Sequence, residues 1–390
     1  MAFKRCSILL LTMLLNFGLW VVPGEAANAA GLSIAAKSAI LLEPSTGAVI
    51  YERNAHQRMP IASLTKLMTL TLALEALEQG KVGLAEMIPG TPKAFEMGGS
   101  QIWLEVGEKL PLKDMLYAVG VGSANDAAMA IAEYLGGSEE GFVKAMNRKA
   151  QQLGMKNTHF SNPTGLDEPE NYSTAYDLAL LAKYAIKFPM LLEISSTWDY
   201  WLRKGTKKQV WLTTYNKMII QYPGYDGLKT GFTDKAGYCV VATAKRADLR
   251  MIAVLLGEAD ARIRTEDTRR LLDHGFGALQ AVKLAKAGEK IGRVEVFKGA
   301  SDTVFVQPRE DLVAVVPRNS NYQFKKELKL MKQLVAPVRK GQVVGQLKAV
   351  ANGKTMSTVD LVAASDVQRG GLLKIILQLT RQMIRTFFAM

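Results

Sequence analysis

The chain has 390 residues, of which 48% are hydrophobic, so it is long enough for two or three domains and too apolar to be intrinsically disordered. Its 49 Lys and Arg residues outnumber its 36 Asp and Glu residues and leave a formal charge of +13. Residues 339–390 alone hold eight basic side chains and two acidic ones. Such a surplus suits a nucleic-acid binder or a protein that rests on an anionic membrane.

Residues 1–29 have the pattern of a secretory signal peptide. Lys4 and Arg5 precede an apolar run from Ser7 to Val22, and Ala27-Asn28-Ala29 fits the small-residue rule for cleavage after Ala29, with Ala27 as second choice. The alternative is an uncleaved membrane anchor. Either way, the rest of the chain is predicted to be exported, which argues against nucleic acid as a partner.

Cysteine and histidine usage bounds the chemistry of the exported part. Cys239 is its one cysteine, so no internal disulfide can form, and its apolar neighbours indicate a buried strand residue. His56, His159 and His274 are scattered along the chain and lack cysteine partners. We therefore predict no metal site and no cofactor.

Residues 30–278 mix strands and helices without regular alternation. A hairpin is predicted over Ser38–Tyr51. Helices are predicted next, and strands then return before a last helix: helices over Ser63–Gln79, two stretches within Leu112–Gly137, and Tyr176–Ile186; strands over 227–232, 238–245 and 250–256; a helix over Thr265–His274. This order predicts an α/β (α+β) domain, in which one antiparallel sheet carries an inserted cluster of helices.

Two further segments follow. Residues 279–365 contain short alternating apolar runs separated by Gly, Pro and Asn, which predicts a small all-β domain. Residues 366–390 fit an amphipathic helix: Lys374, Gln378, Arg381, Gln382 and Arg385 on one face, and Leu372, Ile376, Leu379, Met383, Phe387 and Met390 on the other. Its cations make a spanning helix costly, so we predict attachment at the membrane surface. The alternative is a helix docked on the chain's own β domain.

Three short motifs occur once each in the chain. Ser63-Leu-Thr-Lys66 lies at the start of a predicted helix, Ser123-Ala-Asn125 between two helical stretches, and Lys229-Thr230-Gly231 in a predicted strand. Taken singly, each has a plain structural explanation as a helix cap, a turn or a strand end. Their occurrence together, in this order and in these contexts, favours a catalytic site.

The three motifs provide the groups that acyl transfer needs. A serine hydroxyl is a poor nucleophile until a base takes its proton, and Lys66 lies one helical turn from Ser63. Burial and a second cation, Lys229, would lower the pKa of Lys66 enough for it to be that base. The N–H groups of Ser63 and Phe232 would form the oxyanion hole.

The remaining motif residues suit substrate binding. Ser123 is a candidate proton relay to the leaving amine, and Asn125 can bind the substrate's amide. Lys229 and Thr230 offer a cation and a hydroxyl to a carboxylate.

The motifs resemble those of the serine penicillin-binding proteins and β-lactamases, and most closely those of the low-molecular-mass D-alanyl-D-alanine carboxypeptidases. The resemblance covers essentially the whole chain and rests on five blocks: residues 62–69, 123–126, 162–167, 172–175 and 226–233. It implies a penicillin-binding/β-lactamase-like transpeptidase domain. It also implies that the chain removes the terminal D-alanine from peptidoglycan pentapeptide stems through an acyl-enzyme, and that β-lactam antibiotics trap the same serine.

The resemblance also bears on individual residues. It implies that Ser63 is acylated, Lys66 is its base, Gly231 completes the third motif, and Arg264 lies near the substrate carboxylate. Residues 168–171, Glu-Pro-Glu-Asn, are similar to the stretch that holds the deacylating glutamate of class A β-lactamases, but they are one residue short. We interpret Glu168 as a loop carboxylate.

Two other hypotheses stay open at this stage. A β-lactamase would share the motifs, although the extra β domain and the tail argue against it. A non-catalytic wall-binding protein of the same fold is the other, and the intact motif residues argue against it. The favoured prediction is an exported enzyme at the outer face of the cytoplasmic membrane, held there peripherally by its C-terminal helix.

Overall fold

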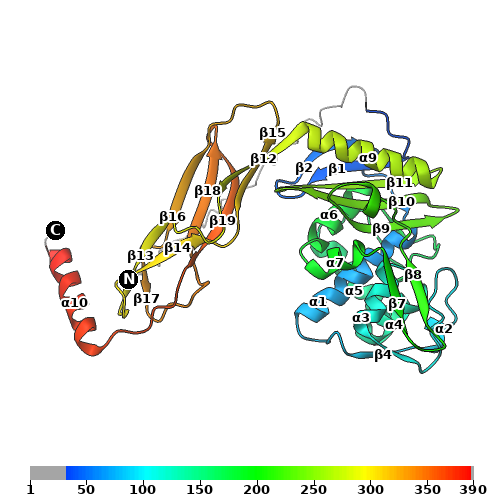
Figure 1. Cartoon of the computed structure of the whole chain (residues 1–390), viewed down its shortest axis with the longest axis horizontal. Helices are drawn as coiled ribbons and strands as arrows, with labels where there is room; N and C mark the ends of the chain where they lie inside the picture. Colours follow the sequence, from blue (N-terminus) through cyan, green and yellow to red (C-terminus); the bar gives the residue numbers. More distant parts are fainter. Residues whose placement is uncertain (1–31, 388–390) are drawn as a thin grey trace, which may run out of the picture.

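The structure is a computed structural model that describes residues 32–387, so the predicted signal peptide lies outside the described residues. Figure 1 shows three parts in chain order: a unit of helices packed on a sheet, a β-rich unit, and a terminal helix at the end of the molecule far from the first unit. Among the described residues, no helix has both the length and the apolar character needed to cross a membrane.

The central sheet of the first unit has five antiparallel strands in the order β2-β1-β11-β10-β9. Its first two strands are the predicted hairpin, and the other three follow only after the helical cluster: β1 (Ser38–Glu43), β2 (Ala48–Arg53), β9 (Tyr225–Thr233), β10 (Gly237–Arg246) and β11 (Leu249–Glu258). Strand β9, which carries the Lys-Thr-Gly motif, is therefore at an edge of the sheet.

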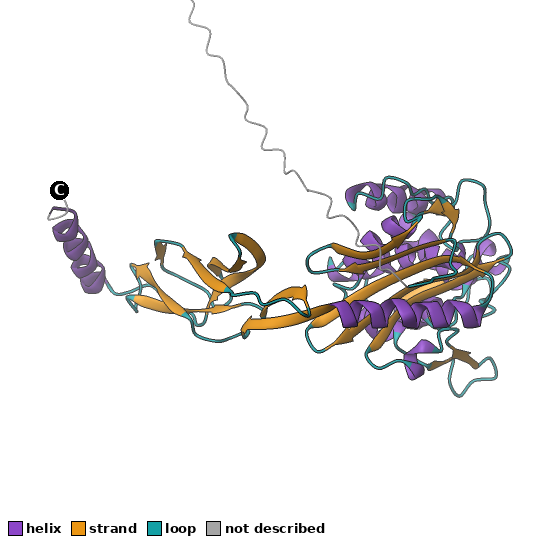
Figure 2. Cartoon of the chain, turned by 90° about the horizontal axis from the view of Figure 1, so that it is seen from above, coloured by secondary structure: helices purple, strands orange, loops and turns teal. Residues whose placement is uncertain are grey.

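Both faces of this sheet are covered by helices (Figures 1 and 2). Alternate residues of a strand point to opposite faces, and Leu41 packs toward α9 (Ala261–Ala278), whereas Ile40 and Leu42 pack toward the helical cluster. The cluster consists of α1 (Lys66–Glu78), α2 (Pro92–Phe95), α3 (Leu112–Gly120), α4 (Asn125–Gly136), α5 (Glu139–Gln152), α6 (Ala175–Ala185) and α7 (Pro189–Ser195).

Short elements complete this unit. They are a 3-10 helix η1 (Ala62–Thr65), a short helix α8 (Met218–Gln221), and three two-stranded pairs: β3 (Met59–Pro60) with β6 (Tyr172–Ser173), β4 (Met87–Pro89) with β5 (Lys109–Pro111), and β7 (Asp199–Leu202) with β8 (Val210–Thr213). The predicted helix over Ser63–Gln79 thus begins as η1 and becomes α-helical at Lys66.

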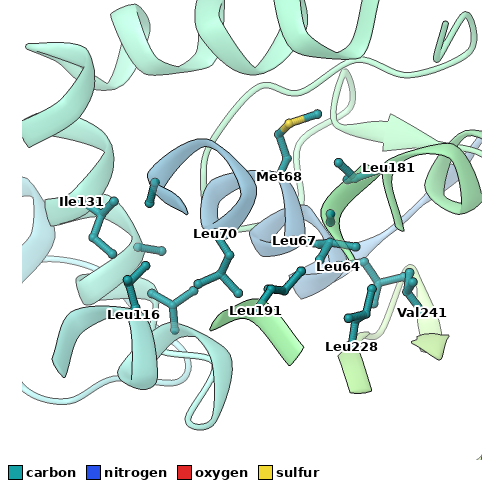
Figure 3. Packing of buried hydrophobic residues seen from close by; sticks show 14 of the residues in the cluster. Leu64, Leu67, Met68, Leu70, Leu116, Ile131, Leu181, Leu191, Leu228 and Val241 are labelled. Carbon is teal, nitrogen blue, oxygen red and sulfur yellow. The ribbon is translucent and has the colours of Figure 1, made fainter. Parts of the chain in front are cut away.

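Helix α1 lies at the centre of the core. Its residues from Lys66 to Thr71 are buried, and Figure 3 shows side chains of five surrounding elements around it: Leu116 of α3, Ile131 of α4, Leu181 of α6, Leu191 of α7 and Leu228 of β9. The N-terminal half of α1 is thus enclosed by the core, whereas its C-terminal end reaches the surface. The first turn of this helix is therefore held in place by contacts in every direction.

The β-rich unit begins directly after α9. Six strands form a sheet in the order β16-β18-β19-β14-β13-β17, and β12 pairs with β15: β12 (Leu279–Ala285), β13 (Gly292–Phe297), β14 (Thr303–Pro308), β15 (Leu312–Pro317), β16 (Lys325–Leu330), β17 (Gln333–Val335), β18 (Val343–Ala351) and β19 (Lys354–Ala363). The unit has a hydrophobic cluster of its own. The predicted fold class, an antiparallel sheet with inserted helices followed by a β-rich part and a terminal helix, is confirmed.

The terminal helix α10 (Leu372–Phe387) turns its polar side toward the β-rich unit. The Lys298 N–H donates to Gln378 Oε1 at 2.7 Å, and Lys374 Nζ donates to the carbonyl of Ala300 at 2.6 Å. Its large apolar side chains point to solvent, with Leu372 and Leu373 more than three-quarters exposed. The contacts with the β-rich unit are therefore polar, and they leave the apolar side of α10 uncovered.

We expect Gly136→Ala to destabilise the helical cluster, because a Cβ there would lie 2.5 Å from the backbone nitrogen of Phe142 at the junction of α4 and α5. Overpacking of this kind costs about 1–3 kcal/mol, and urea unfolding followed by tryptophan fluorescence measures the loss. Gly83→Ala is the matched control, since its Cβ would meet no atom within 4 Å. Equal stabilities of the two variants would contradict the close approach.

Candidate active site

The backbone around Ser63 is held by close contacts from two other segments. Ser63 lies in η1, preceded by Ala62 in the left-handed region at φ +47°. Gly231 of β9 presses against it, because a Cβ there would lie 3.0 Å from the Ser63 nitrogen, and a Cβ at Gly165 would collide with the carbonyl oxygen of Ala62. Glycine at these two positions lets neighbouring backbones approach the turn that carries Ser63.

Lys66 is completely buried beneath Ser63. Its Nζ lies 2.8 Å from Ser63 Oγ and donates to the carbonyl oxygen of Thr164 at 2.5 Å. Burial lowers the pKa of Lys66 well below its ordinary value, and the nearby charge of Lys229 lowers it further, while Asp126 acts in the opposite direction. A lysine that loses its proton readily and touches a serine hydroxyl can act as a general base.

Ser123 and Asn125 follow α3 in a sharp turn. Ser123 has φ +57° and is 5% exposed, and Asn125 is the first residue of α4. The Asn125 side chain donates to the carbonyl of Gly98 at 2.6 Å, whereas its buried Oδ1 has no hydrogen-bond partner among residues 32–387. A strained turn and a buried free acceptor are features that recur at binding sites.

The third motif lies along β9. Lys229 and Thr230 are buried, and Phe232 is half exposed and packs its ring 4.3 Å from that of Tyr238. Burial, followed by the charge of Arg264, lowers the pKa of Lys229 to about 7. Arg264 projects from α9, where burial lowers its pKa too.

One cavity of about 330 Å³ brings most of these residues together. Six of its ten lining residues were predicted from the sequence: Ser63, Ser123, Thr230, Gly231, Phe232 and Arg264. The other three predicted residues, Lys66, Asn125 and Lys229, do not line the cavity; they are buried residues of the same three motifs. The motifs from η1, the α3–α4 turn and β9 therefore meet at one place, although they are as much as 168 residues apart in sequence.

Known proteins share this arrangement of sequence and fold. The family described as D-alanyl-D-alanine carboxypeptidase matches residues 24–260, and the C-terminal domain of penicillin-binding protein 5 matches residues 279–369. The chain is 39% identical to the D-alanyl-D-alanine carboxypeptidase DacF of Bacillus subtilis over 339 residues, which cover 87% of each chain. The chain belongs to the D-alanyl-D-alanine carboxypeptidase family.

Solved structures of family members agree in fold. Penicillin-binding protein 3 from Streptococcus pneumoniae superposes with a TM-score of 0.70 at 30% identity, covering 86% of this chain and all of that one. Penicillin-binding protein 5 from Haemophilus influenzae gives a TM-score of 0.66 at 32% identity, and the match covers 86% of this chain and 98% of that one. The resemblance inferred from the motifs is thus confirmed over most of the chain, and with it the expectation of a serine carboxypeptidase.

Sequence reasoning missed several residues of the cavity and its support. Ser100, Tyr215, Tyr238 and Ala261 also line it. The segment that bears Ser100 is held by Asp126, whose carboxylate accepts the N–H groups of Ile102 and Leu104 at 2.9 and 3.0 Å. Asp126 follows Asn125 directly in the second motif block, so its buried position could have been suspected from that adjacency.

The block 162–167 also acquires a structural explanation. Asn162 Oδ1 accepts the N–H of Gly165 at 2.7 Å and the N–H of Thr164 at 3.1 Å, which orients the Thr164 carbonyl toward Lys66. Glu168 accepts a hydrogen bond from Asn162 at 3.1 Å and lines a different cavity from that of Ser63. Among the described residues, no group of three His, Cys, Asp or Glu side chains is arranged to hold a metal ion.

The pH dependence of acylation gives a test of the Lys66 environment. Only neutral Lys66 can take a proton, so the rate of acylation by penicillin should rise with pH and level off well below the ordinary lysine pKa of 10.5. In Lys229→Met the neighbouring cation is gone, so the pKa of Lys66 rises and the acid limb moves to higher pH. Stopped-flow acylation rates at a series of pH values measure this shift.

Exposed Lys235 provides the control. Lys235→Met removes the same charge from the surface, and its profile should match that of the wild type. An acid limb that stays in place in Lys229→Met would show that Lys229 does not act on Lys66.

Proposed function

We propose that the cavity of Ser63 is the active site of this D-Ala-D-Ala carboxypeptidase and that Ser63 carries the acyl group. The observation that carries the proposal is the 2.8 Å contact between Ser63 Oγ and the buried Lys66 Nζ. A buried amine with a lowered pKa, in contact with a hydroxyl at the wall of a cavity, is typical of a catalytic base.

In the acylation step, Ser63 Oγ attacks the carbonyl carbon between the two terminal D-alanines, and its proton passes to Lys66. The oxyanion that forms would accept hydrogen bonds from the N–H groups of Ser63 and Phe232. The C–N bond then breaks, Ser123 relays a proton to the leaving amine, and free D-alanine departs. Water hydrolyses the resulting ester with the same base, which restores Ser63.

Binding of the substrate's terminal carboxylate would fall to Lys229, Thr230 and Arg264. Burial lowers the pKa of Lys229 to about 7, and a carboxylate beside it would raise that pKa and keep the ammonium charged. Asn125 Oδ1, the buried acceptor without a partner among residues 32–387, suits an N–H group of the peptide. Peptidoglycan stems that end in D-Ala-D-Ala carry both groups.

A β-lactam antibiotic would react as a strained analogue of the same amide. Its ring opening leaves the amine attached to the acyl group, so the leaving group cannot diffuse away. Glu168 lines another cavity, and none of the described residues that line the cavity of Ser63 carries a carboxylate side chain. We therefore favour a long-lived penicilloyl-enzyme over a β-lactamase.

The remaining proposals concern location. We propose that residues 1–29 direct export, that residues 30–278 and 279–365 form a catalytic and a β-rich domain, and that residues 366–390 attach the enzyme to the outer face of the cytoplasmic membrane. Support for the last comes from α10, whose apolar side chains Leu372, Leu373, Ile376 and Leu377 are more than half exposed.

Mass spectrometry after penicillin treatment tests the nucleophile. The wild-type protein should gain one penicilloyl group on the peptide that contains Ser63, and Ser63→Ala should gain none and release no D-alanine, because no other group replaces the nucleophile. Ser161→Ala is the control, since this hydroxyl belongs to a neighbouring segment outside the cavity lining. An adduct on Ser63→Ala would mean that another residue is acylated.

Membrane attachment is tested by two substitutions on the apolar side of α10. Leu372→Glu with Ile376→Glu should release the protein from anionic vesicles in a flotation assay, because each glutamate replaces an exposed apolar side chain on that side. Thr355→Glu with Thr358→Glu makes the same change in charge at exposed positions of β19 and should leave the protein bound. Release of both variants would indicate net charge alone, and release of neither would point to another anchor.

A further inference from the structure

The hairpin of β7 and β8 has one face in the core and one in solvent. Tyr200 pairs with Leu212, and both point inward: the Tyr200 ring stacks on that of Tyr117 at 4.2 Å, and Leu212 is 6% exposed. Trp201 pairs with Trp211, one residue along, so alternation puts both indoles on the opposite face. They are 43% and 55% exposed.

The two indoles form one exposed aromatic platform. Their ring centroids are 5.9 Å apart and their planes are 18° apart, so the two indoles form an offset, nearly parallel stacked pair. Trp211 Nε1 donates to Asp199 Oδ2 at 2.7 Å, which fixes the orientation of that ring. The N–H of Trp211 is therefore already bonded, and a ligand would contact the exposed surfaces of the rings.

The hairpin that carries the platform reaches the active site through its inner face and through the residues that follow β8. A Cβ on Gly122 would lie 2.9 Å from Leu212 Cδ2, so the inner face of the hairpin rests on the turn that presents Ser123. Tyr215, two residues beyond β8, lines the cavity of Ser63.

We propose that Trp201 and Trp211 bind the glycan strand of peptidoglycan while one of its stem peptides occupies the cavity of Ser63. This inference rests on the proposed function, since only a stem-peptide substrate brings a glycan with it. The face of an indole is electron-rich, and the C–H groups of a pyranose ring carry partial positive charge. A saturated sugar ring therefore lies well on an aromatic face without needing a hydrogen bond from it.

The turn of the hairpin adds charge complementarity. Lys204 and Lys207 are exposed and have no ion pair among the described residues, whereas Arg203 and Lys208 pair with Glu108 and Glu105 and tie the turn to the segment beneath it. A glycan strand carries further stem peptides, each of which ends in a carboxylate. The two free ammonium groups would attract such neighbouring stems.

Two substrates separate the platform from the catalytic site. One is the free pentapeptide ending in D-Ala-D-Ala, and the other is an uncross-linked glycan strand that bears the same pentapeptide. Trp201→Thr with Trp211→Thr should lower kcat/KM on the strand about tenfold, mainly through KM. On the free pentapeptide, kcat/KM should stay within about twofold of the wild type, because no reacting group is touched.

Threonine suits a strand surface, which favours folding of the double variant. Trp201→Phe with Trp211→Phe keeps aromatic faces and should restore most of the activity on the strand. Tyr134→Ala removes an exposed ring from α4 and serves as the matched control, with no expected selective loss. Calorimetric titration with strands stripped of their stem peptides should detect binding to the wild type and to Tyr134→Ala, and none to the double Thr variant.

Equal losses on both substrates would overturn the proposal and leave the hairpin as a support of the Ser123 turn. The proposal would also be overturned if the ratio of kcat/KM on the strand to kcat/KM on the free pentapeptide did not change in the double Thr variant. Failure of stripped strands to bind the wild type would overturn it as well. The proposed function has separate readouts, which are D-alanine release from the free pentapeptide and the penicilloyl adduct on Ser63. If the enzyme releases D-alanine and forms the penicilloyl adduct but does not bind the glycan, the platform proposal is refuted and the proposed function stands.

Discussion

The rest of the site depends on one buried group, the amine of Lys66. A charged ammonium in an apolar interior is expensive unless it is paired, and the two oxygens that Lys66 meets, Ser63 Oγ and the Thr164 carbonyl, are both uncharged. Burial therefore lowers the pKa of Lys66 and shifts its equilibrium toward the neutral amine, which is the form that can take a proton. Holding it there requires a first helical turn that cannot move, and the apolar contacts around α1 supply that rigidity. The core of the first unit thus holds Lys66 in place and lowers its pKa.

The sequence was sufficient for those parts of the site whose signal is local. Ser63 and Lys66 are three residues apart and the other motifs are three residues long, so their chemistry can be recognised without a structure. The Thr164 carbonyl belongs to the backbone, and every residue type has such a carbonyl, so the sequence gives no signal of its role. Ser100, Tyr215 and Tyr238 reach the cavity from separate segments, and only the tertiary fold determines their proximity. Helix α5 was not predicted because its buried stripe is narrow, with Phe142, Met146 and Ala150 four residues apart.

The tail illustrates a different limit of sequence reasoning. The amphipathic pattern predicted two faces for the helix, and it left open whether the membrane or the β-rich unit receives it. In the structure the helix contacts the β-rich unit through Lys374 and Gln378, which are members of the polar face. Docking and membrane attachment are therefore compatible, since they would use opposite sides of α10. The polar contacts would hold the apolar side in a fixed direction relative to the β-rich unit.

The distance between helix α10 and the cavity of Ser63 can be understood if the substrate is a polymer. Helix α10 lies at one end of the molecule, and the cavity of Ser63 belongs to the unit at the other end (Figure 1). An enzyme held at a surface meets an immobilised polymer at an effective concentration set by the span between anchor and site. If the indole platform also holds the strand, the stem peptide reaches Ser63 as part of an already bound ligand. Weak contacts at the anchor, the platform and the cavity are then enough to bind the strand, because translational freedom is lost only once for all three. This accounts for a catalytic cavity of modest size, about 330 Å³, in an enzyme whose proposed substrate is far larger.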